Sequence, residues 1–238
     1  STYVTSRSTF SPGTCAMMLL LLHVAGVTRL ATGLSVAVFG SGGRLGKRVV
    51  RGLKDSGASV LEVSRERHHN DLAQALQQRA VSTAIIALGS GHYASRDAFA
   101  VDGLQSQQVL RTFAKDTYVV LVSAVGVDDY STRWPPDEEI SMLEDCQECG
   151  PRPEVLHWKR ESELYLRHSG LAYTIVRPVT FRDADDPEAP RIHVPGTFPS
   201  LCDDHHVSRT SVSTFLVDLA LQRSRDFMHR TVEVSGSR

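Results

Sequence analysis

The chain has 238 residues, of which 41% are hydrophobic, 22% are charged and 7% are aromatic, as in an ordinary soluble α/β protein. This composition excludes collagens, mucins, disordered tails and multi-span membrane proteins. Its 26 basic and 27 acidic residues give a formal net charge of -1, so no overall field draws the chain to nucleic acid and we expect no nucleic-acid partner.

Residues 1–34 differ in composition from the rest of the chain. They are rich in Ser, Thr, Ala and Leu and contain arginines but no acidic residue, which is typical of a transit peptide. Their apolar run from Ala16 to Val27 is about 12 residues long, as in a secretory signal, and falls short of the roughly 20 that span a bilayer. Because a free apolar terminus frays and promotes aggregation, we expect residues 1–34 to be an extension of the mature protein that docks on a partner.

From Ser35 onward, short β-branched runs alternate with helical stretches, which is typical of a parallel sheet covered by helices on both faces. Right-handed crossovers then give one doubly wound α/β domain over residues 35–238. The expected strands are Ser35–Phe39, Ser59–Val63, Thr83–Leu88, Tyr118–Ser123, Ala172–Val176 and Thr231–Val234, and the expected helices are Leu45–Asp55, Asp71–Arg79, Asp97–Lys115, His157–His168 and Ser211–Arg223.

The junction between the first strand and the first helix carries a Gly-x-x-Gly-x-x-Gly motif at Gly40, Gly43 and Gly46. Leu45 occupies the position that would complete Gly-x-Gly-x-x-Gly. Gly40 permits a tight turn, Gly43 lets the backbone approach a pyrophosphate, and Gly46 lets the helix pack closely on the strand. The free N–H groups of the helix N-terminus then face the anion. The motif predicts a dinucleotide site, with a strand-to-helix turn that binds nothing as the alternative.

Arg65 follows the second strand, at the point where a dinucleotide-binding fold recognises the adenosine ribose. An acidic residue there would bind the 2′-hydroxyl of NAD, whereas a guanidinium accommodates the 2′-phosphate of NADP. Glu62 lies three residues earlier, within the strand. Arg65 therefore favours NADP(H) over NAD(H), and a solvated surface arginine is the alternative.

Residues 128–154 are acidic and contain four prolines, so we interpret them as a surface insertion. Within them, Cys146 and Cys149 form a Cys-x-x-Cys pair, for which Cys202 and His205 could supply a second zinc half-site. Structural zinc requires four ligands in closed geometry, and a single Cys-x-x-Cys is weak support, so we assign no metal site. A reversible disulfide and two free thiols remain open for this pair.

Several segments of the chain are similar to those of one known family. The segments are Val38–Gly46, Leu121–Val127, Ser169–Pro178, Val207–Arg209 and Thr231–Val234. In their sequence and order they resemble the atypical short-chain dehydrogenase/reductases of the NmrA-like branch, over residues 35–238. The resemblance implies a Rossmann-like fold that binds NAD(P).

The resemblance also implies a set of site residues. Ser123 takes the place of the family's active-site serine and Lys159 that of its helix lysine, which makes these two the candidate catalytic residues. Ala87 and Gly89 would lie along the adenine side of the cofactor, and Pro178 would line the nicotinamide pocket. The implied cofactor-binding residues are Gly40, Gly43, Arg44, Gly46, Arg65, Ala87, Gly89, Ser123, Lys159 and Pro178.

One position departs from the family's catalytic pattern. Tyrosine-dependent members place Tyr four residues before Lys, so that the cation lowers the pKa of the phenol and the phenolate exchanges a proton. This chain has Val155 at that position. Tyr130 and Tyr165 are the nearest tyrosines before and after Lys159 in the sequence, and Tyr165 lies on a different face of the helix from Lys159. Many NmrA-like proteins also lack the tyrosine and bind NADP(H) as a sensor or structural ligand.

Two functional hypotheses follow. In the first, favoured by Val155 and the extension, the chain is an NADP(H)-binding, non-catalytic accessory or assembly subunit of an organellar membrane complex. It would dock through residues 1–34 with peripheral membrane contact, at the chloroplast thylakoid or alternatively in the mitochondrion. In the second, it is an NADPH-dependent reductase of a small carbonyl or quinone, in which Lys159 holds the nicotinamide ribose and Ser123 hydrogen-bonds the substrate carbonyl.

Overall fold

A seven-stranded sheet forms the centre of the fold in the computed structural model, which describes residues 33–64, 69–90, 98–128, 153–184, 189–196, 206–223 and 225–236. The strand order is β2-β1-β3-β4-β5-β9-β7, and every neighbouring pair is parallel except β7 and β9. Because the order reverses beside β1, the crevice at the carboxyl ends of β1 and β3 is the expected ligand position. The bounds are β1 Ser35–Phe39, β2 Ser59–Val63, β3 Thr83–Ile86, β4 Tyr118–Val122, β5 Ala172–Pro178, β7 Arg191–His193 and β9 Arg230–Ser235.

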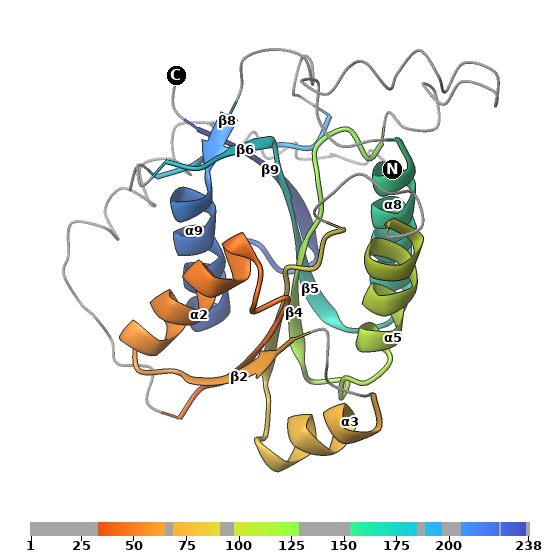
Figure 1. Ribbon diagram of the computed structural model, residues 1–238, viewed down its shortest axis with the longest axis vertical. Coiled ribbons are helices and arrows are strands. Elements are labelled where there is room, and N and C mark those ends of the chain that lie inside the picture. The colour runs from red at the N-terminus through yellow and green to blue at the C-terminus, as the bar shows by residue number, and fades with distance from the viewer. Residues whose placement is uncertain are drawn as a thin grey trace, which may run out of the picture. The chain divides into compact units, whose positions relative to one another are not determined.

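Helices cover both faces of this sheet, which confirms the expected doubly wound architecture (Figure 1). One face packs on α2 (Arg44–Asp55) and α9 (Arg209–Gln222). The opposite face packs on α3 (His69–Gln78), the π-helix η1 (Ala98–Gln105), α5 (Ser106–Leu110) and α8 (Pro153–His168).

The central strands are apolar along their whole length because both of their faces are covered. All five residues of β1 are buried, and so are those of β4. Side chains alternate between the faces, so Val36 and Val38 join the core beneath α2 and α9 whereas Ala37 and Phe39 join the opposite core.

Helix α9 brings its N-terminus to the same edge of the sheet as the N-terminus of α2. The Ser208 side chain caps α9 by accepting a hydrogen bond from the backbone N–H of Ser211 at 2.9 Å. The two helices lie side by side, and a Cβ built on Gly52 of α2 would lie 3.0 Å from the Val217 side chain of α9. Both helices therefore present their positive ends near the glycine turn.

The structure differs from the sequence expectations at several element ends and in three short strands. Helix α8 begins four residues before the expected start at His157, and β5 ends two residues after Val176. Strand β3 ends at Ile86, two residues early, and the single helix expected over 97–115 is instead η1 followed by α5. Two short strands, β6 (Thr180–Arg182) and β8 (His206–Ser208), pair in parallel as a separate two-stranded sheet that the sequence analysis missed, together with β7. Three-residue strands are too short for a detectable period and exist because of their pairing partners.

Several sequence predictions fall on residues that the structure does not describe. They are the extension at residues 1–32, Arg65, the Cys146–Cys149 pair with Cys202 and His205, and nearly all of the acidic insertion at 128–154. Within the described ranges, no helix has both the length and the apolar character needed to cross a membrane.

Candidate functional site

The glycine turn between β1 and α2 is shaped by close backbone packing. Gly40 has φ +78°, and a Cβ on it would lie 2.5 Å from the carbonyl oxygen of Ala87. A Cβ on Gly46 would lie 2.1 Å from the carbonyl oxygen of Gly40. The turn can therefore hold this shape only with glycine at 40 and 46. The backbone of Ala87, a residue expected on the adenine side of the cofactor, packs directly against Gly40.

Gly43 is the N-cap of α2, and its N–H donates to the Gly40 carbonyl at 2.9 Å. A Cβ on Gly43 would lie 3.2 Å from that same carbonyl oxygen, which is a milder constraint. Among the described residues no side chain caps this helix end, and its first turn has no acidic residue. The first N–H groups of α2 are thus open to an anionic ligand.

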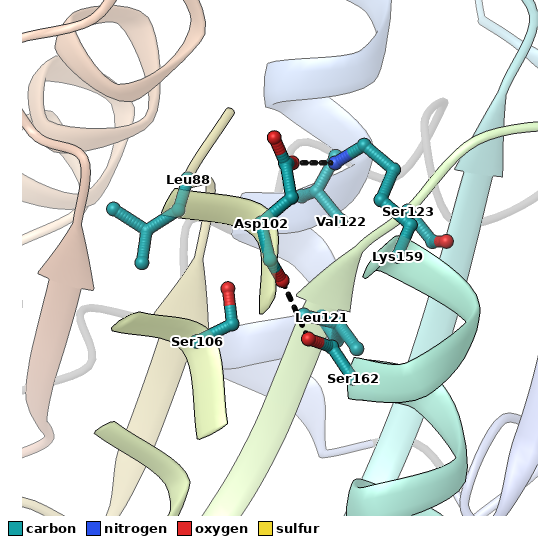
Figure 2. Close-up of a pocket in the computed structure, with 8 residues that line it drawn as sticks. All are labelled: Leu88, Asp102, Ser106, Leu121, Val122, Ser123, Lys159 and Ser162. Carbon is teal, nitrogen blue, oxygen red and sulfur yellow. Dashed lines mark hydrogen bonds and ion pairs between the residues drawn. The ribbon is translucent and has the colours of Figure 1, made fainter. Parts of the chain in front are cut away.

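A pocket opens at the carboxyl end of β4, between β3, η1 and α8 (Figure 2). It contains two of the predicted site residues, Ser123 and Lys159. Its lining residues are Leu88, Asp102, Ser106, Leu121, Val122, Ser123, Lys159 and Ser162.

Lys159 reaches from α8 toward η1 and forms an ion pair with Asp102, with 2.8 Å between Nζ and Oδ1 (Figure 2). The Asp102 side chain is fully buried and that of Lys159 is 13% exposed. The other carboxylate oxygen of Asp102 accepts a hydrogen bond from the backbone N–H of Ser90 at 3.1 Å. The lysine is therefore held in one orientation, with its charge balanced by a buried partner.

The sequence analysis did not select Asp102. The stretch Ala98–Gln105 is largely apolar and Asp102 is its one charged residue. An apolar stretch is usually buried, and a buried carboxylate needs a partner, so this pattern indicates a paired acid. The π-helical turn that carries it is itself a conformation found often at functional sites. Ser162 Oγ donates to the Asp102 carbonyl at 2.5 Å, which ties η1 to α8.

Ser123 lies directly after β4 and is 5% exposed. Its backbone N–H donates to the Val176 carbonyl at 2.8 Å, which fixes the residue at the strand end. Its hydroxyl has no hydrogen-bond partner among the described residues. Since buried hydroxyls are normally paired, this one is available to a ligand in the pocket.

No tyrosine lines the pocket among the described residues. Val155 stands one helical turn before Lys159 and is half-buried. The hydroxyl of Tyr118 is paired with Thr174 at 2.6 Å, and that of Tyr165 accepts from Arg111 at 3.1 Å. Burial raises the pKa of Tyr118, which makes it a poorer source of protons. Tyr130, the other tyrosine named in the sequence analysis, lies outside the described residues.

The remaining predicted residues lie around the glycine turn and the pocket. Pro178 ends β5 and accepts a hydrogen bond from the Val125 N–H at 3.1 Å, which joins the loop after β4 to the end of β5. Gly89 follows Leu88 at the rim of the pocket. The Arg44 side chain does not line the pocket, because it extends to Asp183 instead.

A buried charge cluster fixes α8, and with it Lys159, on the sheet. Arg177 of β5 donates two hydrogen bonds to Glu163 of α8, at 2.9 and 2.7 Å, and both side chains are 2% exposed. It also donates to Asp128 at 2.9 Å. Burial alone would lower the pKa of Arg177, but the hydrogen bonds to Glu163 and Asp128 outweigh it and raise that pKa. The guanidinium therefore stays charged.

No group of three or more metal-ligating side chains occurs among the residues that the structure describes.

Comparison with known proteins gives one family and several solved structures. The model of a family described as NAD(P)H-binding matches residues 40–223. A short-chain dehydrogenase/reductase from Veillonella parvula, solved in complex with NADP, has a TM-score of 0.56 and 16% identity, over 86% of this chain and 94% of that one. No curated protein sequence matches the chain.

Two further structures extend the likeness in fold. A protein from Bacillus halodurans, provisionally described as an NAD-dependent epimerase/dehydratase, has a TM-score of 0.66 and 18% identity, over 86% of this chain and 94% of that one. An anaerobillin reductase from Escherichia coli has a TM-score of 0.55 and 19% identity, over 84% of this chain and 96% of that one.

Proposed function

Because the chain belongs to the NAD(P)H-binding family, and so to the atypical short-chain dehydrogenase/reductase group that its sequence resembles, we propose that it binds a nicotinamide dinucleotide, with a preference for NADP(H). The observation that carries the proposal is the glycine turn, whose backbone leaves no room for a Cβ at Gly40 or Gly46. Behind it, the uncapped N-terminus of α2 favours a pyrophosphate.

The pocket residues suit the nicotinamide half of such a ligand. Lys159 would donate to the hydroxyls of the ribose, and Asp102 balances its charge, so the pair offers a donor with little net charge. A neutral ribose matches that donor better than an anionic group would. The free hydroxyl of Ser123 would bond the nicotinamide carboxamide or a second ligand. When bound, the reduced dinucleotide supplies a hydride.

Cofactor preference gives the first test. We expect NADPH to bind about tenfold or more tightly than NADH, because a guanidinium at Arg65 would make charge-assisted hydrogen bonds to the 2′-phosphate. Titration of cofactor fluorescence measures both affinities. Arg65→Ala should abolish the difference, while Arg51→Ala on the exposed surface of α2 should keep it. Equal affinities of the unaltered chain for NADPH and NADH would contradict the proposed preference for NADP(H).

We propose that the bound dinucleotide serves an accessory or assembly role instead of rapid carbonyl reduction. Val155 supports this, because a valine has no proton to give to a carbonyl acceptor. Lys159 is already held in an ion pair with Asp102. The composition of residues 1–34 supports docking on an organellar membrane complex, with the chloroplast thylakoid favoured over the mitochondrion.

A second candidate function, NADPH-dependent reduction of a small carbonyl or quinone, is favoured by the free buried hydroxyl of Ser123. We expect NADPH oxidation with such acceptors to be lower by a factor of about 10² to 10⁴ than with a positioned general acid. Val155→Tyr, which restores a phenol one turn before Lys159, should raise the rate. Steady oxidation by the unaltered chain that disappears in Lys159→Ala would instead establish the reductase.

A further inference from the structure

Asp183, in the segment after β6, bridges two arginines. One carboxylate oxygen lies 3.0 Å from Arg44 Nη1 and the other lies 2.6 Å from Arg209 Nη1. Arg44 is the first residue of α2, in the glycine turn, and Arg209 is the first residue of α9. A single carboxylate thus joins the N-terminal ends of two helices that are 165 positions apart in the sequence.

The two arginines differ in their freedom to move. The Arg209 side chain is 11% exposed, and its guanidinium lies 5.0 Å from the centroid of the Phe181 ring, so it is held in place. The Arg44 side chain is 63% exposed. Neither helix has an acidic residue in its first turn. Two guanidiniums and two positive helix ends therefore converge on a position where, among the described residues, Asp183 supplies the one carboxylate.

Asp183 is held only weakly between the two arginines. Its side chain is 49% exposed, and exposed ion pairs contribute little because water and salt screen them. A pyrophosphate carries more charge than a carboxylate, and each of its phosphates can accept paired hydrogen bonds from a guanidinium. It would also bind the open N–H groups of α2, which Asp183 is not seen to do.

We infer that Arg44 and Arg209 form an anion subsite for the pyrophosphate of the dinucleotide, and that Asp183 occupies this subsite in the free chain. The inference rests on the proposed function and adds Arg209 and Asp183 to the site. Binding would transfer Arg44 from Asp183 to the phosphates. Asp183 therefore competes with the ligand and lowers its affinity.

The ionisation of Asp183 agrees with this arrangement. Desolvation acts to raise its pKa, but the hydrogen bond from Arg209 and the charges of both arginines outweigh it and lower that pKa. The carboxylate is consequently ionised at neutral pH and opposes an incoming anion.

The test compares the full chain with Asp183→Asn, which removes the competing charge and keeps the side-chain shape. Asp55→Asn is the matched control, because Asp55 also pairs with an exposed arginine but lies at the far end of α2. Calorimetric titration with NADPH and, separately, with inorganic pyrophosphate should show about two- to fivefold tighter binding of both to Asp183→Asn. The control should match the unaltered chain.

Arg209→Gln supplies the opposite change and should weaken pyrophosphate binding about tenfold. Arg44→Gln, at an exposed position, should weaken it in the same direction if Arg209→Gln fails to fold. Undetectable pyrophosphate binding in every variant, or unchanged or weaker binding in Asp183→Asn, overturns the inference.

The outcomes separate the inference from the proposed function. Tighter pyrophosphate binding in Asp183→Asn without any NADPH binding would support the anion subsite and contradict dinucleotide binding. NADPH binding by the unaltered chain, with no effect of Asp183→Asn on either ligand, would keep the proposed function and overturn the subsite.

Discussion

Arg177→Ala should lower the free energy of unfolding by about 3–5 kcal/mol, because the buried carboxylate of Glu163 loses the guanidinium that balances its charge. Glu163 would keep only a longer contact at 3.4 Å to Arg167 among the ion pairs described, and Glu233, 4.0 Å from Arg177, would lose a nearby positive charge. Urea unfolding followed by circular dichroism measures the change. Arg51→Ala removes an arginine from an exposed pair and should change stability by less than about 0.5 kcal/mol.

Adding Glu163→Gln to Arg177→Ala should recover part of the loss, since the buried negative charge disappears. An Arg177→Ala chain as stable as the unaltered one would show that the cluster contributes nothing.

The same cluster gives stability an acid dependence. The hydrogen bond from Arg177 lowers the pKa of Asp128, so the folded state binds this proton less readily than the unfolded state does. The resulting stabilisation is present above the ordinary aspartate pKa, near 3.8, and is lost as the pH falls through the lower folded value. Arg177→Ala should remove this part of the acid dependence.

Gly46→Ala should disrupt the glycine turn and reduce dinucleotide affinity at least about tenfold. The added Cβ would lie 2.1 Å from the Gly40 oxygen, 2.8 Å from the Gly40 carbonyl carbon and 3.0 Å from the Ser41 Cα. All three are backbone atoms, so the turn itself must move, at a cost of about 1–3 kcal/mol or more in stability. Cofactor titration and urea unfolding on the same samples measure both effects.

Gly42→Ala is the matched control, because a Cβ at Gly42 meets no atom within 4 Å. It should unfold like the unaltered chain, to within about 0.5 kcal/mol. If Gly46→Ala bound dinucleotide and unfolded as Gly42→Ala does, the turn could not have the shape described.

The parts of the fold that the sequence predicts well are those with strong local signals. The buried strands β1 and β4 are continuous apolar runs, and the glycines at 40 and 46 are required by backbone contacts that any strand–turn–helix of this kind makes. The family resemblance names Ser123 and Lys159 as the candidate catalytic residues, and in the structure both line one pocket. Their roles there stay a prediction.

The parts that sequence reasoning missed depend on partners far away in the chain. Asp102 is defined by its ion pair with Lys159, 57 positions later, and Asp183 by arginines on two separate helices. Strand β6 exists through pairing with β8. The apolar stretch around Asp102 indicates only that its carboxylate is buried and paired, and it does not name the partner. Nothing within a few residues of Asp183 distinguishes it from a solvated surface acid.

The sheet order has a consequence for the chain during its synthesis. Strand β9 lies between β5 and β7 in the sheet, yet it is made after both. Until it leaves the ribosome, one edge of β5 has its backbone N–H and carbonyl groups unpaired, and β7 has no neighbour in the main sheet. Such edges recruit other strands. A nascent chain paused within α9 would therefore depend on chaperones to avoid pairing with another unfinished copy.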